Sequence, residues 1–228
     1  MQPLLTHPWD VSPEEAQALQ QRLRERVRLE PLTGPLRVVG GVDVSVRGDV
    51  ARAAVVRFSY PDLQPLEAAT AELPVTFPYL PGLLAFREGP AVLSAMARLE
   101  GQADVWLFDA HGLAHPRRMG LATHMGILLD CPAIGCARSR LWGQHGEVPA
   151  DQGGWVALED GEEVVGAVVR TRAGVRPIYV SVGHRMTLAT AIEIVLRCCA
   201  GYRLPEPVRW AHRVAGGQVF PGRQLSFL

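Results

Sequence analysis

Cysteine is scarce in this chain, and lysine and long hydrophobic runs are missing altogether. The four cysteines among 228 residues form no C-x-x-C pair, and two of them are adjacent. Neither a disulfide framework nor a zinc site is therefore expected. No run of about 18 apolar residues is present to cross a membrane, and the N-terminus lacks the pattern of a signal peptide. We expect a cytoplasmic protein with reduced thiols and no membrane partner.

Arginine alone carries the positive charge. The 23 basic residues balance 23 acidic residues, so the formal net charge is zero. This balance excludes a uniformly basic surface but allows a local basic groove. With 48% hydrophobic and 20% charged residues, the chain can bury a large core. No internal repeat or convincing linker divides it, so we expect one domain over residues 1–228, acting as a monomer.

The order of the expected elements is typical of a mixed α/β sheet. A capping box at Ser12 with Pro13 begins an amphipathic helix that runs to about residue 30. Three strands joined by short turns then form an antiparallel meander. From residue 105 onward, strands alternate with helices, as in a parallel sheet. The expected strands are 39–46, 51–58, 66–73, 104–109, 133–136, 164–170 and 178–181, and the later helices are 83–99, 121–129 and 187–200. This order predicts a ribonuclease-H-like mixed sheet flanked by helices.

Three carboxylates occupy positions that such a sheet brings together. Asp43 lies in the middle of the first strand, where an unused charge is costly. Glu88 lies on the first helix after the meander, and Asp109 ends the apolar fourth strand, where ligand groups collect in open sheets. A turn-forming Asp43 and a solvated Glu88 are the alternatives. Because three clustered carboxylates repel one another, we expect one or two Mg²⁺ ions, with Mn²⁺ as a substitute. Two such ions can hydrolyse a phosphodiester.

A stiff loop follows the meander. Pro78 and Pro81 flank Tyr79 and Leu80, and Gly82 frees the backbone again. The loop therefore presents an aromatic side chain on a rigid support. Tyr79 could anchor the core, or it could wedge between nucleic-acid bases as projecting side chains do.

Six segments, taken together and in order, resemble the endonuclease V family. They are GVD at 41–43, FPYLPGLLAFRE at 77–88, GLAHPRR at 112–118, PAIGCA at 132–137, SVGHRM at 181–186 and RLPEP at 203–207. The resemblance implies a metal-dependent DNA-repair nuclease that recognises deoxyinosine, the product of adenine deamination. Such a nuclease hydrolyses the second phosphodiester bond 3′ to the lesion and leaves 3′-hydroxyl and 5′-phosphate ends.

The resemblance also implies roles for individual residues. Asp43, Glu88 and Asp109 would bind the metal, and His212 would contact metal or water. Tyr79, within the loop Pro78 to Pro81, would be the wedge. Further assignments are the base pocket (Gly82, Leu84 and Ala110) and the phosphate contacts (His115, Arg117 and His184).

Two positions depart from the family pattern. Arg138 stands where the family commonly has lysine; arginine can stabilise phosphate charge but cannot transfer a proton near neutral pH. Ala110 stands where glycine is common, and its methyl group can narrow or shift the base pocket. The nuclease assignment is therefore firmer than the base preference.

Several alternatives stay open at this point. His111 and His115 are four residues apart, but the neighbouring Gly112 and Pro116 argue against the helix of a zinc hydrolase. His184 suits a phosphate contact or a structural hydrogen bond equally well. A basic groove is a further possibility, formed by Arg117, Arg118, Arg138, Arg140 and Arg185.

Two other functions compete with the DNA nuclease. Single-stranded RNA containing inosine is an alternative substrate, because carboxylates do not read the sugar. A non-catalytic nucleic-acid-binding domain of the same fold is the other alternative, and the three carboxylates argue against it.

Overall fold

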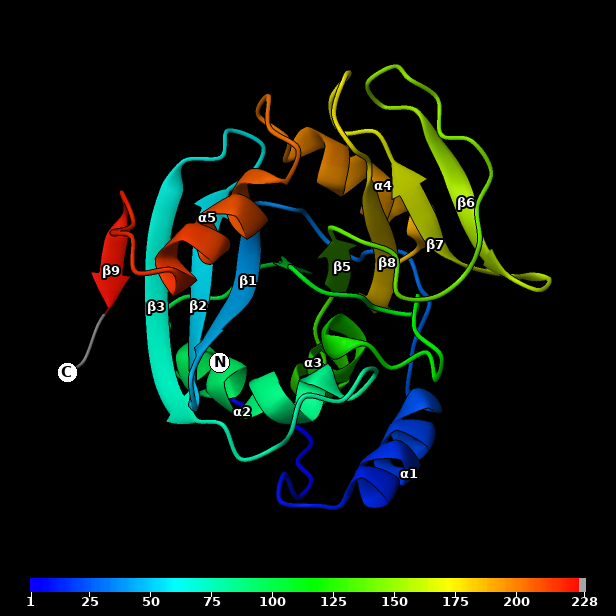
Figure 1. The fold of residues 1–228 in the computed structure, drawn as a ribbon. Coiled ribbons are helices and arrows are strands. Elements are labelled where there is room, and N and C mark those ends of the chain that lie inside the picture. Colours follow the sequence, from blue (N-terminus) through cyan, green and yellow to red (C-terminus); the bar gives the residue numbers. More distant parts are fainter. Residues whose placement is uncertain (226–228) are drawn as a thin grey trace.

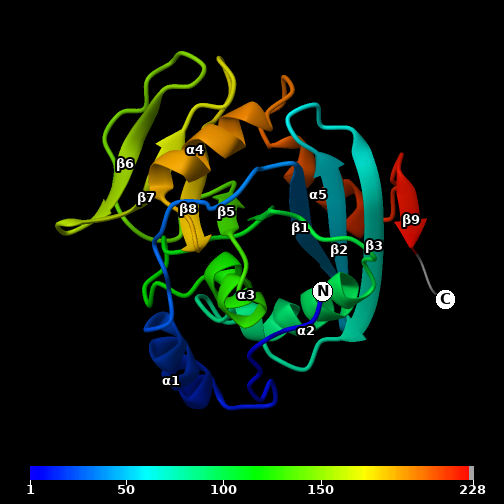
Figure 2. The same ribbon diagram turned by 180° about the vertical axis from the view of Figure 1, so that it is seen from behind.

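A nine-stranded sheet runs through the computed structural model, which describes residues 1–225, and helices pack on both of its faces (Figures 1 and 2). The strand order is β6-β7-β8-β5-β4-β1-β2-β3-β9. The strands are β1 Val38–Arg47, β2 Val50–Ser59, β3 Pro65–Pro74, β4 Val105–Phe108, β5 Ala133–Ala137, β6 Trp155–Asp160, β7 Glu163–Val169, β8 Ile178–His184 and β9 Arg223–Leu225. The helices are α1 Pro13–Arg24, α2 Leu84–Ala97, α3 Leu121–Leu129, α4 Leu188–Arg197 and α5 Glu206–Ala215.

Three parallel strands form the centre of the sheet. β1 pairs in parallel with β4, and β4 with β5. The meander β1-β2-β3 is antiparallel, which confirms the predicted mixed sheet. The two strands expected at 164–170 and 178–181 form an antiparallel hairpin, β7 and β8, and β8 joins the central strands by pairing with β5 in antiparallel fashion.

Alternation along β1 sends its side chains to two different cores. Val42 and Val44 face α2 and α3, which lie beside each other in Figure 1. Val39 belongs to the core on the other face, with α4 and α5. α5 crosses β1 and β2 closely (Figure 1), because Gly41 has no side chain: a Cβ there would lie 2.0 Å from the carbonyl oxygen of Pro207. Glycine therefore lets α5 lie directly on the strand that carries Asp43.

The first helix is shorter than predicted. α1 ends at Arg24, not near residue 30. The backbone after it pairs elsewhere: the amide of Arg185 donates to the carbonyl of Arg28 at 2.8 Å, and the amide of Arg28 donates to Nδ1 of His184 at 3.3 Å. These tertiary bonds replace the hydrogen bonds of a further helical turn.

Three elements were not predicted from the sequence. β6 lies between the expected strands 133–136 and 164–170, and α5 and β9 follow the last expected helix, 187–200. α5 is the most important of these, because it carries His212. The strands of the meander and α3, by contrast, are confirmed within one residue at each end.

The expectation of free thiols is confirmed, since all four cysteines are unpaired and three are buried. Among the described residues, no helix combines the length and the apolar character that crossing a membrane requires.

Candidate active site

Strand register places Asp43 beside Asp109. Val42 on β1 is paired with Phe108 on β4, and the amide of Asp109 donates to the carbonyl of Val42 at 2.9 Å. The residue after each member of this pair is an aspartate. Because side chains alternate along parallel neighbours, both carboxylates leave the same face of the sheet. Their side chains are only 12% and 9% exposed, respectively.

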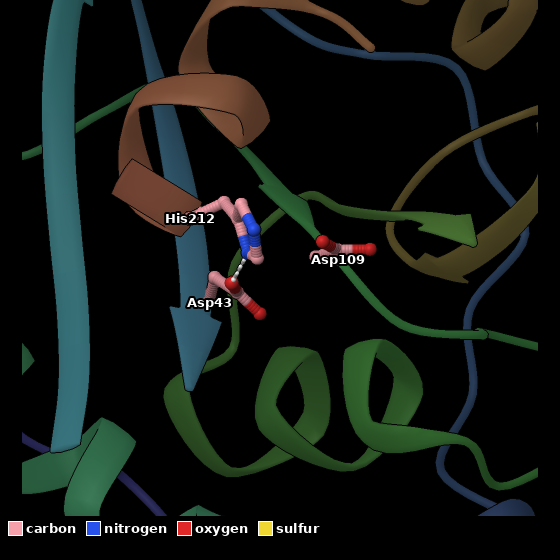
Figure 3. A group of neighbouring side chains, drawn as sticks. All are labelled: Asp43, Asp109 and His212. Atoms are coloured by element: carbon pink, nitrogen blue, oxygen red, sulfur yellow. Dashed lines mark hydrogen bonds and ion pairs between the residues drawn. The ribbon is translucent and has the colours of Figure 1, made fainter. Parts of the chain in front are cut away.

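His212 reaches this pair from α5. Its Nδ1 lies 2.7 Å from Oδ2 of Asp43, and in the tautomer with a proton on Nδ1 the ring donates to the carboxylate. One potential ligand atom from each of Asp43, Asp109 and His212 lies within 4.8 Å of the others. Figure 3 shows the three side chains converging from β1, the end of β4 and α5. We refer to these three residues as the carboxylate centre.

Glu88 lies near the carboxylate centre but outside this tight group. Burial, followed by the negative charge of Asp43, raises the pKa of Glu88 to about 8, and Asp109 adds to the effect. Burial and then Asp109 raise the pKa of Asp43 to about 6, although the hydrogen bond from His212 opposes this shift. Negative charge is thus crowded and poorly solvated here. Oxygen and imidazole donors under such repulsion fit a divalent cation such as Mg²⁺ or Mn²⁺.

Arg138, which follows β5, adds a positive charge to the site. Its Nη2 forms an ion pair with Asp109, and its carbonyl accepts from Nη2 of Arg203 at 2.6 Å. Its Nε is buried without a partner. The structure therefore places Arg138 at the carboxylate centre, where an electrostatic role is possible.

A cavity of about 500 Å³ opens next to Asp109. The expected base-pocket residues Gly82, Leu84 and Ala110 all line it, as do Tyr79, Leu80 and Pro81. Tyr79 is 69% exposed, so the interpretation of Tyr79 as a core anchor is wrong. Pro78 is exposed and does not line the cavity.

The carbonyl of Gly82 organises one wall of this cavity. It accepts from Nε2 of His115 at 2.9 Å and from Nη2 of Arg117 at 2.8 Å. A third bond comes from the side chain of Gln20 at 3.0 Å. Gly82 has φ +81°, and a Cβ there would lie 2.8 Å from the Arg117 guanidinium, so a larger residue would distort the wall.

His115 does not suit the expected phosphate contact. Its Nδ1 accepts from the amides of Arg117 and Met119 at 3.1 and 3.3 Å, so both ring nitrogens are used within the chain. The ring is only 2% exposed, and burial lowers its pKa to about 4. A neutral ring with occupied nitrogens offers nothing to a phosphate. The guanidinium of Arg117 is also partly used by hydrogen bonds within the chain, because its Nε donates to the side-chain oxygen of Gln20 at 2.6 Å.

His184 lies apart from the cavity, at the end of β8 near the C-terminus of α3. Its Nε2 is 3.2 Å from Oδ1 of Asp130, and its Nδ1 accepts from Arg28. The structural hydrogen bond is therefore the better interpretation of His184. Arg185 pairs with Glu30 and Asp130 and does not line the cavity, which removes it from the expected basic groove.

Sequence reasoning missed two parts of the cavity. His111 lines it with its Nδ1 buried and unpartnered, and burial lowers its pKa to about 4. Leu141 lines it from the segment after β5. No local signal marks either residue, because only the fold brings 111 and 141 to the same space.

Comparison with known proteins identifies the family. The family model described as Endonuclease V matches residues 21–213. This chain belongs to the endonuclease V family. The endonuclease V of Roseiflexus castenholzii is 51% identical over 221 residues, which cover 97% of this chain and 100% of that protein. The endonuclease V of Methanothrix thermoacetophila is 50% identical over 206 residues, which cover 90% of this chain and 92% of that protein.

Solved endonuclease V structures have the same fold. The Streptomyces avermitilis enzyme superposes with a TM-score of 0.88 at 40% identity and covers 95% of this chain and 97% of its own. A Ciona intestinalis endonuclease V, in complex with a 23mer DNA containing an inosine followed by a ribo-adenosine, gives 0.80 at 28% identity, with coverage of 91% and 98%. The predicted family and its ribonuclease-H-like fold are confirmed.

Proposed function

We propose that this endonuclease V cleaves DNA beside deoxyinosine and thereby starts the repair of deaminated adenine. The observation that carries the proposal is that Asp109 belongs both to the carboxylate centre and to the wall of the 500 Å³ cavity. A base held in the cavity brings its own strand to the carboxylates. The DNA complex of the Ciona intestinalis relative supports inosine as the recognised base.

Asp43, Asp109 and His212 would hold a divalent cation, Mg²⁺ by preference, with Glu88 beside them. A bound cation of this kind activates water and stabilises the leaving oxygen of a phosphodiester. Glu88 must lose a proton before it can bind the cation at neutral pH, since burial and the neighbouring negative charges raise its pKa to about 8. Asp43, with a pKa of about 6, is already largely ionised there. The Arg138 guanidinium lies where it can balance phosphate charge.

In this proposal, the residues that line the cavity recognise the base. Extruding a base from the duplex costs a few kcal/mol, and least for a poorly paired base such as hypoxanthine. We propose that the exposed Tyr79 fills the gap which the extruded base leaves. Gly82, Leu84 and Ala110 would then surround the base. The methyl group of Ala110 is buried at 5% exposure, so it takes up part of the space that a family glycine would leave.

Cutting the second phosphodiester bond 3′ to the lesion is also part of the proposal, as is action by a single chain, because one chain supplies both the cavity and the carboxylates. Inosine-containing RNA is a second candidate substrate. The complex of the Ciona intestinalis relative favours it, since a ribonucleotide follows the inosine in that complex.

Cleavage of an end-labelled duplex with one deoxyinosine tests the proposal. We expect cutting with Mg²⁺, no cutting with EDTA, and no cutting of the matched undamaged duplex. A parallel RNA strand with one inosine ranks the two substrates. Equal cutting of damaged and undamaged DNA, or cutting that persists in EDTA, would refute the proposed function.

A further inference from the structure

The cavity has a second wall whose outer edge is apolar and exposed. The segment after β5 lines the same cavity as Tyr79 and Leu80, with Arg140 and Leu141. Leu141 is 39% exposed, and its neighbour Trp142 is 40% exposed. Two neighbouring large apolar side chains are thus exposed beside the cavity.

This segment is fixed at both ends. On one side, Arg138 is held by its ion pair with Asp109 and by the bond from Arg203 to its carbonyl. On the other side, the backbones of Gln144 and Glu159 exchange hydrogen bonds of 2.7 and 2.8 Å. The residues between these anchors therefore project from a rigid base.

Hydrogen bonds to Asp160 connect the same segment to the loop that follows β4. The indole Nε1 of Trp142 donates to Oδ2 of Asp160 at 2.7 Å, and Nη2 of Arg118 donates to the same oxygen at 2.6 Å. Arg118 is 7% exposed, and its Nη1 donates to the carbonyl of His115 at 2.9 Å. Asp160 thus links the segment to the loop that carries Ala110 and His115.

The chemistry of the projecting edge suits one kind of partner. Arg140 is exposed, and no carboxylate within residues 1–225 forms an ion pair with it. An apolar side chain next to an unpaired guanidinium matches a nucleotide, which offers an apolar base face and a phosphate. Proteins insert leucine between bases in this way.

We propose that Leu141 is a second wedge, resting on the proposed function of the cavity. Leu141 packs on a base that neighbours the extruded deoxyinosine, while Tyr79 fills the gap that the extruded base leaves. Arg140 contacts a phosphate of the same strand. Tyr79 and Leu141 thus both contact the damaged strand next to the lesion, and the contact of Leu141 does not require the complementary strand.

Steady-state cleavage of deoxyinosine DNA by Leu141→Ala tests this inference. We expect KM to rise about tenfold, as the loss of a buried leucine contact implies, while kcat changes little. The rise should be equal for single-stranded and duplex substrates, and Leu141→Met should restore most of the lost affinity. Leu29→Ala is the matched control, since Leu29 is 62% exposed and lies outside the cavity wall.

Arg140→Gln provides a second measurement. We expect it to weaken binding to damaged and undamaged strands alike and to lower the salt dependence of binding by roughly one phosphate contact. If Leu141→Ala behaves like Leu29→Ala while the wild type cuts deoxyinosine DNA, the inference is wrong and the proposed function stands. A loss confined to duplex substrates would also overturn it, because Leu141 would then contact the complementary strand. Failure of the wild type to cut would refute the proposed function itself.

Discussion

At the scale of single residues, the proposed chemistry depends on two neighbouring carboxylates with little access to water. Asp43 and Asp109 are adjacent because Val42 and Phe108 are paired on parallel strands. Each is expected to be a ligand that a neutral amide of the same shape replaces poorly. In the proposed function the damaged base is held by the cavity walls instead, so we expect binding and cutting to be separable.

Asp109→Asn tests this separation. We expect cutting to fall by about a thousandfold or more, since several kcal/mol of charge stabilisation are lost. Deoxyinosine binding should largely persist. Asp62→Asn, at an exposed turn carboxylate, is the control and should cut normally. Loss of deoxyinosine binding in Asp109→Asn, measured by fluorescence anisotropy, would show that the two functions are not separable.

Glu88 predicts a pH dependence of stability in the metal-free protein. Its pKa is raised to about 8 in the folded state, against about 4.3 in an unfolded chain. The folded protein therefore binds more protons between these two values, so its free energy of unfolding falls as pH rises through this window. Glu88→Gln removes the penalty.

We accordingly expect Glu88→Gln in EDTA to melt roughly 10 °C higher than the wild type at pH 9. The two proteins should melt alike below about pH 4, where the unfolded carboxyl is protonated as well. Thermal melts at several pH values measure this difference. If the melting temperatures of the two proteins differed by the same amount at every pH, Glu88 would not be buried among carboxylates.

The sequence identified the carboxylates more reliably than the contacts around them. Asp43 was found because a charge in the middle of an apolar strand is costly, and Asp109 because it ends a buried strand. His115 and Arg117 were assigned to phosphate, but their polar atoms hold the carbonyl of Gly82. A sequence pattern shows which groups can donate, not which acceptor the fold supplies.

At the scale of elements, α2 needs outside support to hold Glu88 in place. Its N-cap Leu83 offers no side-chain hydrogen bond, and Pro90 lies inside the helix, where it removes a backbone bond. Trp9 supplies the support: its ring packs on Phe86 with centroids 5.9 Å apart. A Cβ at Gly89 would lie 2.7 Å from Trp9.

Trp9→Ala should therefore affect the metal requirement as well as stability. We expect a loss of about 2 kcal/mol, less than for a fully buried aromatic residue, and a several-fold rise in the Mg²⁺ concentration for half-maximal cutting. Trp155→Ala, at a 48% exposed residue on β6, is the control. An unchanged Mg²⁺ requirement, measured well below the melting temperature, would show that α2 positions Glu88 without Trp9.

α5 illustrates why some elements escaped prediction. It is only ten residues long, and its start at Pro205-Glu206-Pro207 resembles an extended proline-rich segment. Acidic and proline residues in the first turn are nevertheless typical of a helix start. Val208, Ala211 and Val214 at helical spacing are all fully buried. This pattern could have revealed the helix. Without it, His212 was assigned through the family resemblance alone.

At the scale of the whole molecule, the site forms only because elements that are distant in sequence are neighbours in the fold. β1, β4 and α5 are distant in sequence, yet the strand order places β4 beside β1 and α5 across it. Local patterns predicted the strands of the meander well. They could not predict that β8 pairs with β5 in antiparallel fashion or that residue 141 lines the cavity, because those features depend on tertiary pairing.

The same arrangement fixes where the strand is cut. Since Asp109 serves both the cavity and the carboxylate centre, the extruded base and the cleaved bond are a set distance apart. Mapping the cut at single-nucleotide resolution, on 5′-labelled duplexes with deoxyinosine at several positions, tests this most directly. We predict one product in every case, ending with a 3′-hydroxyl one nucleotide beyond the deoxyinosine. Cuts that scatter, or that do not move with the deoxyinosine, would contradict the account.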